Sequence, residues 1–273
     1  MDWSRAKTII IALLLAVNAF LLVTYIIREN DARQEELAIR ENVSAILKNQ
    51  GINVEAAKIP LNSLKIRNCT IKSAEDTEKI ASRLLPDMTL SSGGDSIVYS
   101  GKFGNIMFLK ESFSLVYEAE KSVTNADDAK DIANLIASKL GVSTSRTRFE
   151  VSGGESGYAV KIPQIFAGVR IFGSDIELNI SGGGNVIGSG KFIGQGKLRR
   201  ADGEGLLTSA LMIKFADAVR GKALGELTIL EISPGYVAKA PVGGIVSLVP
   251  TLMINTDKGK FYINMTDGEI IEV

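Results

Sequence analysis

The pattern of hydrophobic and polar positions changes sharply near residue 28. Residues 9–27 form an apolar run without a charged side chain, in which only Asn18 and Thr24 are clearly polar. As a helix that rises 1.5 Å per residue, this run spans roughly 28 Å, about the hydrocarbon thickness of a bilayer. The run therefore predicts a transmembrane helix near the N-terminus.

The charges that flank this run favour a cytoplasmic N-terminus. Arg5 and Lys7 precede it, whereas Arg28 follows it and is succeeded at once by acidic residues. Because the cytoplasmic flank of a membrane helix carries the excess of lysine and arginine, we expect the chain from about residue 29 onward to be extracytoplasmic. The alternative is a cleaved signal peptide, since residues 17–19 have the spacing of a cleavage site. However, mostly apolar residues continue beyond that point, so we predict an uncleaved single-pass anchor in the cell membrane.

Small side chains form a stripe along the predicted transmembrane helix. Thr8, Ala12, Ala16 and Ala19 follow helical spacing, and Asn18 lies beside the end of the stripe. In lipid, small residues let helix backbones approach each other, and a buried amide requires a hydrogen-bond partner. We therefore expect Ala12, Ala16, Asn18 and Ala19 to form a partner-binding surface. The alternative is that alanine is simply common in membrane segments.

The remainder of the chain alternates between amphipathic helices and groups of short strands. Residues 31–50 predict a helix that ends at Gly51 and either continues the membrane helix as a stalk or packs on the folded part. Further helices are predicted at residues 73–85, with Ser73 as N-cap, at 125–140 and at 208–220. Strands are predicted at residues 96–103, 106–109, 113–118, 148–152, 157–162, 165–171, 175–181, 186–193, 226–233, 235–239, 245–255, 260–264 and 269–273, with a hairpin turn at Gly104-Asn105.

This alternation predicts an α+β fold. We expect an N-terminal transmembrane helix followed by an extracytoplasmic part in which antiparallel sheets pack with helices. A polar stretch at residues 121–125 suggests a boundary within that part. The expected organisation is a cytoplasmic stub and anchor at 1–28, a juxtamembrane helix at 29–51, a first α+β subdomain at 52–122 and a second α+β domain at 123–273.

Composition excludes several classes of function. The chain has no histidine and one cysteine, so histidine-dependent nucleophiles, histidine ligands and cysteine-based metal clusters are excluded. Its 31 basic and 31 acidic residues cancel, which argues against nucleic-acid binding. The glycine-rich stretch from Gly188 to Lys191 lacks the spacing of a phosphate-binding loop. We therefore predict no catalytic, cofactor-binding or metal-ligating residue.

Two stretches resemble known families. The opening from Met1 to Thr8, MDWSRAKT, runs straight into the apolar helix and closely resembles the start of YycI proteins. YycI proteins are membrane-anchored regulators of the WalK (YycG) sensor histidine kinase in low-GC Gram-positive bacteria. Residues 164–174, QIFAGVRIFGS, resemble hairpins of PepSY-like and peptidase-propeptide domains, to which the ectodomains of YycI and YycH are similar. The second α+β domain is therefore expected to be PepSY-like.

The resemblance implies a non-enzymatic regulator of a sensor histidine kinase. Its anchor would pack in the membrane lipid against helices of the kinase and of a YycH-like companion, and a regulator needs only differential affinity for two kinase conformations. A second hypothesis is a surface-anchored module that binds peptides or wall fragments, with the anchor only a tether. An enzyme without histidine would depend on carboxylates or lysines, and no spacing favours a particular pair.

Overall fold

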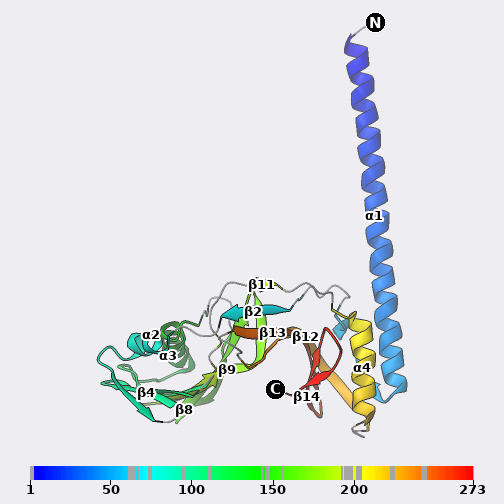
Figure 1. The fold of residues 1–273 in the computed structure, drawn as a ribbon. Helices are drawn as coiled ribbons and strands as arrows, with labels where there is room; N and C mark the ends of the chain where they lie inside the picture. The colour runs from blue at the N-terminus through cyan, green and yellow to red at the C-terminus, as the bar shows by residue number, and fades with distance from the viewer. Residues whose placement is uncertain are drawn as a thin grey trace. The chain divides into compact units, whose positions relative to one another are not determined.

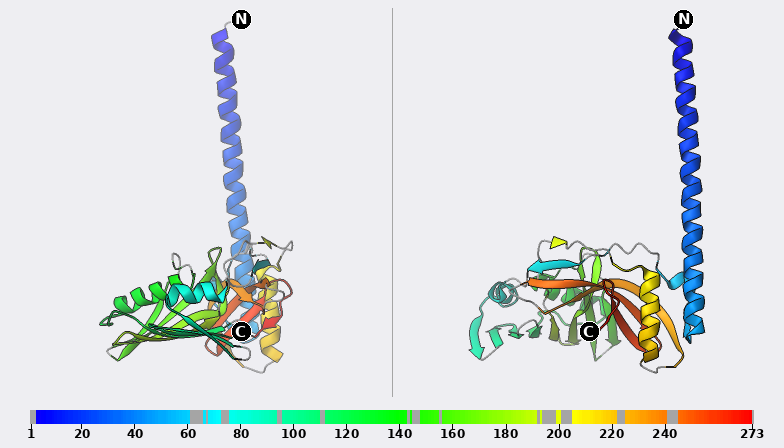
Figure 2. Two further views of the ribbon diagram at one scale, coloured as in Figure 1. Left: turned by 60° about the vertical axis from the view of Figure 1, so that its left-hand side comes forward. Right: turned by 45° about the vertical axis from the view of Figure 1, so that its right-hand side comes forward.

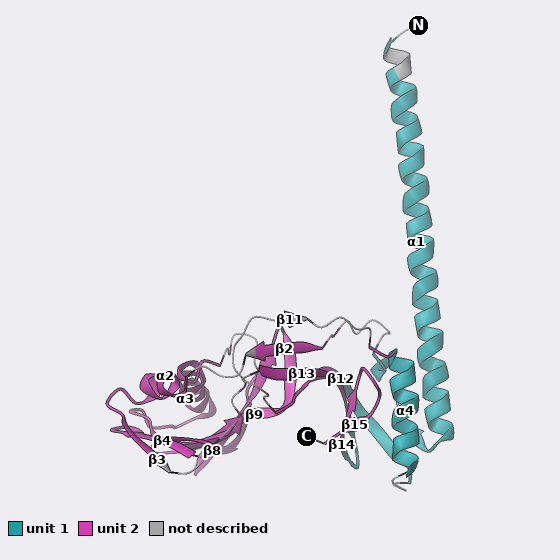
Figure 3. Cartoon of the chain, in the orientation of Figure 1, with its two compact units in different colours: residues 1–64, 207–232, 255–259 teal, residues 65–206, 233–254, 260–273 magenta. Residues whose placement is uncertain are grey.

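The structure is a computed structural model of the 273-residue chain. It describes residues 3–60, 66, 68–72, 76–93, 96–109, 112–142, 144, 148–154, 156–191, 193, 199–200, 205–221, 225–240 and 245–272. The chain divides into two compact units (Figure 3). The first unit comprises residues 1–64, 207–232 and 255–259, and the second comprises residues 65–206, 233–254 and 260–273.

The first unit is organised around one long helix, α1, at Trp3–Asn49. Both views in Figure 2 show α1 as a single unbroken helix, so the predicted membrane helix continues directly into the predicted juxtamembrane helix. The C-terminal end of α1 also packs, because Val43 and Leu47 are buried there. Gly51 follows the helix with a φ of +78°, a conformation that glycine adopts without strain. Both predicted alternatives for residues 31–50 are therefore found: the segment continues the membrane helix as a stalk, and its C-terminal end packs on the folded part.

The other elements of the first unit pack on the end of α1. Strand β1 at Ile52–Asn53 pairs in parallel with Leu227 and Thr228 at the start of β12, Leu227–Ala238. A 3-10 turn follows β1 at Ala56–Lys58, and helix α4 at Thr208–Gly221 contacts α1 (Figure 1). The buried apolar residues of this unit include Val43, Leu47, Ile52, Ile59, Leu211, Met212, Phe215, Ala216, Val219, Leu227 and Ile229.

The second unit contains a large antiparallel sheet. Its neighbouring strands pair in the order β3-β4-β5-β6-β10-β9-β8-β7, which differs from the order along the chain. The strands are β3 Thr89–Gly93, β4 Ser96–Gly101, β5 Gly104–Leu109, β6 Ser112–Glu118, β7 Glu150–Gly154, β8 Gly157–Phe166, β9 Val169–Ser181 and β10 Asn185–Lys191.

Two helices cover one face of this sheet, α2 at Thr77–Leu84 and α3 at Ala126–Lys139 (Figure 1). Asn125 caps α3 by accepting hydrogen bonds from the backbone N–H groups of Asp127 and Asp128, each at 2.9 Å. The helix predicted at residues 125–140 is confirmed, and its apolar side chains are buried against the sheet: Ala129, Ile132, Ala133, Ile136 and Leu140. Helix α2 begins later than predicted, with Asp76 as its N-cap, and Ser73 lies outside the described residues.

The shared core of α2 and α3 explains why the compact units do not follow the predicted bounds. Ile80 of α2, Ile106 of β5 and Ile136 of α3 belong to one hydrophobic cluster. Residues before and after position 122 therefore fold together in the second unit, whereas the predicted division placed them in separate parts at 52–122 and 123–273. The difference arises because sequence-distant strands pair: β6 is hydrogen-bonded to β10.

The predicted hairpin turn lies elsewhere in the structure. Gly104 and Asn105 belong to β5, and the β4–β5 hairpin turns at Lys102 and Phe103. Gly104 has a φ of +135° and passes so close to the backbone of Val116 that a Cβ atom would clash with the Val116 carbonyl. The predicted turn was wrong because the glycine at position 104 is required by the close approach of β5 to β6 and does not form the turn.

The long β8–β9 hairpin turns at Ala167 and Gly168, whose φ values of 50° and 83° suit a tight hairpin turn. The strand predicted at residues 165–171 is therefore divided between β8 and β9.

The remaining strands of the second unit make the whole sheet mixed. The later part of β12 pairs in parallel with β9, where Tyr236 is opposite Ile171. Strand β13 at Ile245–Thr256 pairs with β2 at Cys69–Lys72, β2 with β11 at Arg199–Arg200, and β14 at Gly259–Asn264 with β15 at Ile270–Ile271. The predicted α+β class, an N-terminal apolar helix followed by sheets packed with helices, is confirmed.

Candidate functional site

The predicted partner-binding residues lie on the exposed apolar part of α1. Ala12, Ala16 and Ala19 are spaced by four and three residues, so the helix brings them to one face. Asn18 is adjacent to Ala19 in sequence and therefore lies about 100° around the helix axis from it. All four side chains are exposed. The structure thus gives this part of α1 two distinct features on different faces, a stripe of small residues and an amide.

The two polar side chains of the apolar run differ in their hydrogen bonding. Thr24 donates its hydroxyl to the backbone carbonyl of Phe20 at 2.8 Å and is satisfied within the helix. The amide of Asn18 has no hydrogen-bond partner within the described part of the chain. In a hydrocarbon environment such a group costs free energy until a neighbouring helix supplies a partner.

Aromatic residues flank the apolar part of α1. Lys7 Nζ lies 5.4 Å from the ring centroid of Trp3, and Tyr25 lies near the other end of the run. Trp3 and Tyr25 are separated by roughly 33 Å along the helix, and aromatic side chains at that spacing are typical of the two membrane interfaces. The described residues contain one helix long and apolar enough to cross a membrane, and the most apolar part of it is entirely unburied. Such a helix is either a membrane anchor or a signal sequence.

A second candidate site lies on the large antiparallel sheet, on the face opposite α2 and α3. We call this the outer face. One row of small side chains crosses three neighbouring strands of this face: Ser152 of β7 is opposite Ala159 of β8, which is opposite Asn179 of β9. The row continues to Ile187 of β10 and Val116 of β6, which are both exposed.

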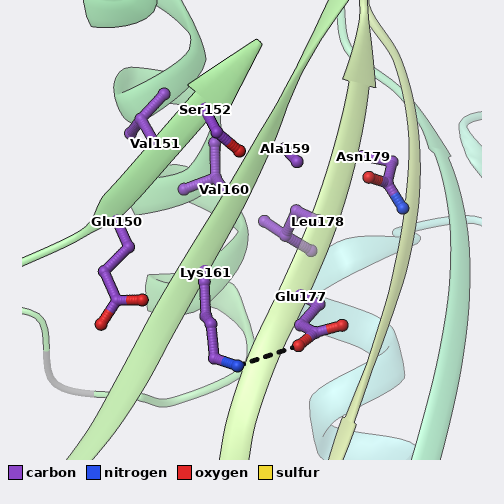
Figure 4. A pocket seen from close by; sticks show the side chains of 9 residues that line it. All are labelled: Glu150, Val151, Ser152, Ala159, Val160, Lys161, Glu177, Leu178 and Asn179. Carbon is purple, nitrogen blue, oxygen red and sulfur yellow. Dashed lines mark hydrogen bonds and ion pairs between the residues drawn. The ribbon is translucent and has the colours of Figure 1, made fainter. Parts of the chain in front are cut away.

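These small side chains leave two adjoining hollows in the outer face. One has a volume of about 440 Å³ and the other of about 510 Å³, and both are lined by Ser152, Ala159 and Asn179. Figure 4 shows the first hollow, with Glu150, Lys161 and Glu177 on the same three strands as its small residues. Volumes of this order are typical of ligand pockets, although these hollows are open to solvent.

Charged side chains form a network beside the first hollow. Lys161 Nζ lies 3.1 Å from Glu177 Oε1 and 3.4 Å from Asp175 Oδ2. Arg170 contacts Asp175 at 3.0 Å and Glu150 at 3.5 Å. These partners, chiefly Glu177, which accepts a hydrogen bond from the Lys161 ammonium, raise the pKa of Lys161 above its usual value, so the ammonium stays charged.

The network has one more carboxylate than cation, because Glu150, Asp175 and Glu177 face Lys161 and Arg170. Asp175 is largely buried, with 13% of its side chain exposed, and its Oδ1 atom has no hydrogen-bond partner. Burial raises the pKa of the nearby Tyr262 hydroxyl, and the positive charge of Arg170 partly offsets that shift. Glu150 and Glu177 remain 58% and 62% exposed and so keep free acceptor oxygens at the surface.

No group of three or more histidine, cysteine, aspartate or glutamate side chains in the described ranges is arranged to hold a metal ion. The lone cysteine, Cys69, is buried in β2, with its Sγ atom 3.4 Å from the hydroxyl of Tyr236.

Sequence reasoning did not find the outer-face site. The only sequence signal for this site is the alternation of polar and apolar residues at 175–180, which places Asp175, Glu177 and Asn179 on one face of a strand. The partners of that face on β7, β8 and β10 depend on strand order and register, which the pattern does not contain.

Comparisons with known proteins give a fold and no family. No model of a protein family matches the chain, and no curated protein matches its sequence. Among solved structures, an uncharacterized protein from Eubacterium rectale ATCC 33656 is similar at a TM-score of 0.52, with 10% identity over 76% of this chain and 86% of that one. The C-terminal domain of Bacillus megaterium YpeB aligns over 74% of this chain and 100% of its own, with 13% identity and a TM-score of 0.36. The first likeness concerns the fold alone, and the second has too low a score to support an argument.

Proposed function

We propose that the chain is a membrane-anchored, non-enzymatic regulator of a cell-envelope sensor histidine kinase. In this proposal α1 contacts transmembrane helices of a WalK-like kinase and of a YycH-like companion. The observation that carries it is the unpartnered amide of Asn18 within an otherwise apolar, exposed helix surface. The opening residues Met1 to Thr8, which resemble the start of YycI proteins, supply the identity of the expected partners.

The geometry of α1 suits two neighbours rather than one. A helix that packs closely against Ala12, Ala16 and Ala19 does not also face Asn18, because the amide lies about 100° around the axis. The small residues permit a close backbone approach by one partner, and the amide offers a hydrogen bond to another. This arrangement supports a ternary assembly of kinase, companion and regulator.

The continuity of α1 supports coupling between the membrane and the first unit. The helix runs without interruption from the apolar segment to Leu47, which is fully buried in the core of that unit. A rotation or shift of the apolar segment is therefore transmitted to residues packed against α4. In the proposed topology the N-terminus is cytoplasmic and the folded part, with a PepSY-like second domain, is extracytoplasmic.

An exchange of the anchor tests this proposal. Residues 1–28 are replaced by an unrelated membrane helix with the same flanking charges, and the output of the kinase is measured with a transcriptional reporter. We expect the output to change while the protein remains in the membrane at its normal level. An unchanged output would contradict the proposal and would favour the surface-anchored binding module.

A further inference from the structure

No described helix of the second unit covers the outer face of the large antiparallel sheet. Helices α2 and α3 both pack on the opposite face, through a hydrophobic cluster that includes Val160, Leu178 and Val186. Solvent-facing sheet surfaces normally carry long polar side chains. One row of this face across β7, β8 and β9 instead carries Ser152, Ala159 and Asn179, and the hollows of about 440 and 510 Å³ lie over them.

Apolar side chains continue this surface beyond the hollows. Ile187, which lines the second hollow, is 62% exposed and lies directly opposite Val116, which is 48% exposed. The neighbouring row brings Met107 of β5 opposite Val98 of β4. Along the row that contains Ala159, the outer face thus changes from a small polar residue on β7 to aliphatic residues on β10 and β6.

The charge beside the hollow favours a cationic ligand group. Asp175 already contacts both Lys161 and Arg170 and is largely shielded from solvent. Glu177 pairs with Lys161 and Glu150 pairs with Arg170, so the three carboxylates of this network exceed its cations by one charge. An ammonium or guanidinium group placed at the first hollow would contact the free oxygen of Glu177, which lines this hollow, without displacing the pair of Glu177 with Lys161.

We propose that the outer face binds a polypeptide segment of another protein in which a lysine or arginine lies beside aliphatic side chains. The cationic group contacts Glu177, the backbone lies over Ser152, Ala159 and Asn179, and the aliphatic side chains cover Ile187 and Val116. The serine and asparagine side chains supply hydrogen-bond donors and acceptors for peptide groups. This site lies in the second unit and does not depend on the proposed contacts of α1.

The test uses the full chain in detergent micelles and a phage-displayed library of random heptapeptides. Peptides are selected on the wild type and counter-selected on Ala159→Trp, which fills the hollow from an exposed strand position that tolerates aromatic residues. We expect enriched peptides to contain lysine or arginine next to aliphatic residues and to lose binding to Ala159→Trp. They should bind Ser100→Trp normally, because Ser100 is an exposed outer-face residue on β4, away from the hollows.

A charge variant separates this site from nonspecific binding. Glu177→Gln should weaken the selected peptides about threefold, as expected for a partly exposed ion pair, and added salt should reduce the difference. Glu78→Gln on α2 should leave their affinity unchanged, because Glu78 is exposed on a helix that packs against the other face of the sheet. The proposal is overturned if no peptide is enriched, or if the enriched peptides lack a lysine or arginine. It is also overturned if the enriched peptides bind Ala159→Trp as well as the wild type. Binding of a purified muropeptide in the hollow, with no binding of any peptide, would likewise contradict it.

Discussion

Ser44, in the last two turns of α1, donates its hydroxyl hydrogen bond to the backbone carbonyl of Val54 at 2.8 Å. The bond ties the end of the long helix to the chain that returns along it after Gly51. The same turns bury Val43 and Leu47 in the core of the first unit. The apolar part of α1 and the folded part of this unit are thus joined by a packed helix end rather than by a free linker.

Leu47 is therefore expected to stabilise the first unit strongly. Leu47→Ala removes a fully buried side chain and should lower the free energy of unfolding of this unit by about 2–5 kcal/mol. Ile46→Ala, one residue earlier and 41% exposed, should change it by less than about 1 kcal/mol. Hydrogen exchange of the α4 amides in the full chain measures both effects. Equal protection of α4 in the two variants would show that α1 does not contribute to this core.

Gly104 is expected to tolerate no side chain. Gly104→Ala places a Cβ atom against the Val116 carbonyl at a φ of +135°, and we expect a loss of at least about 1 kcal/mol of stability. Gly154 provides the matched control, since a Cβ added there meets no atom within 4 Å. Thermal unfolding should show a lower midpoint for Gly104→Ala alone. A midpoint shared with the wild type would mean that β5 and β6 do not approach each other as closely as described.

Acid should weaken the second unit through Asp128. Its carboxyl lies 2.5 Å from Lys121 Nζ and accepts hydrogen bonds from the hydroxyl and N–H of Thr124, at 2.7 and 3.2 Å. These contacts, the Lys121 hydrogen bond first, hold the pKa of Asp128 well below its usual value. Because the folded-state pKa is the lower one, the stabilisation is present above about pH 4 and is lost as the pH falls further.

Asp128→Asn should accordingly flatten the fall in stability below about pH 4, as measured by urea unfolding at a series of pH values. Asp131→Asn is the control, because Asp131 is 73% exposed and lies 3.8 Å from the same lysine. If Asp131→Asn flattens the fall in stability as much as Asp128→Asn does, or more, the assignment of the acid sensitivity to Asp128 is contradicted.

Cys69 should be protected in the native protein. It is the single cysteine of the chain and only 3% exposed. We expect a thiol reagent such as Ellman's reagent to react slowly with the folded protein and to titrate one thiol per chain in denaturant. Rapid reaction under native conditions would indicate that β2 is not buried as described.

The elements that the sequence predicted well are those defined by local signals. Helix α3, predicted at residues 125–140 and found at Ala126–Lys139, has its asparagine cap, its apolar stripe and its terminal glycine within one short stretch of chain. The apolar run that forms the exposed part of α1 is equally local. Asn18 could be identified as a candidate from the sequence because one amide within a membrane-length apolar run stands out without any tertiary information.

The elements that the sequence did not predict depend on distant pairing. Strand β10 lies between β9 and β6, and β9 pairs in parallel with β12, so neither the sheet order nor the unit boundaries follow the chain. The hollow on the outer face exists because Ser152, Ala159 and Asn179 come into register from three strands. Each residue alone is an ordinary exposed strand position.

The most direct test of the central claim concerns the amide of Asn18. Asn18→Leu removes the unpartnered polar group, and Thr24→Val is the matched control because the Thr24 hydroxyl is already bonded to Phe20 within the helix. The measurement is recovery of the sensor kinase and of the YycH-like protein with the tagged full chain from detergent-solubilised membranes. We predict that Asn18→Leu reduces recovery of at least one partner roughly threefold to tenfold, as the loss of one hydrogen bond in the membrane implies, while Thr24→Val retains both. Wild-type recovery of both partners with Asn18→Leu would contradict the account.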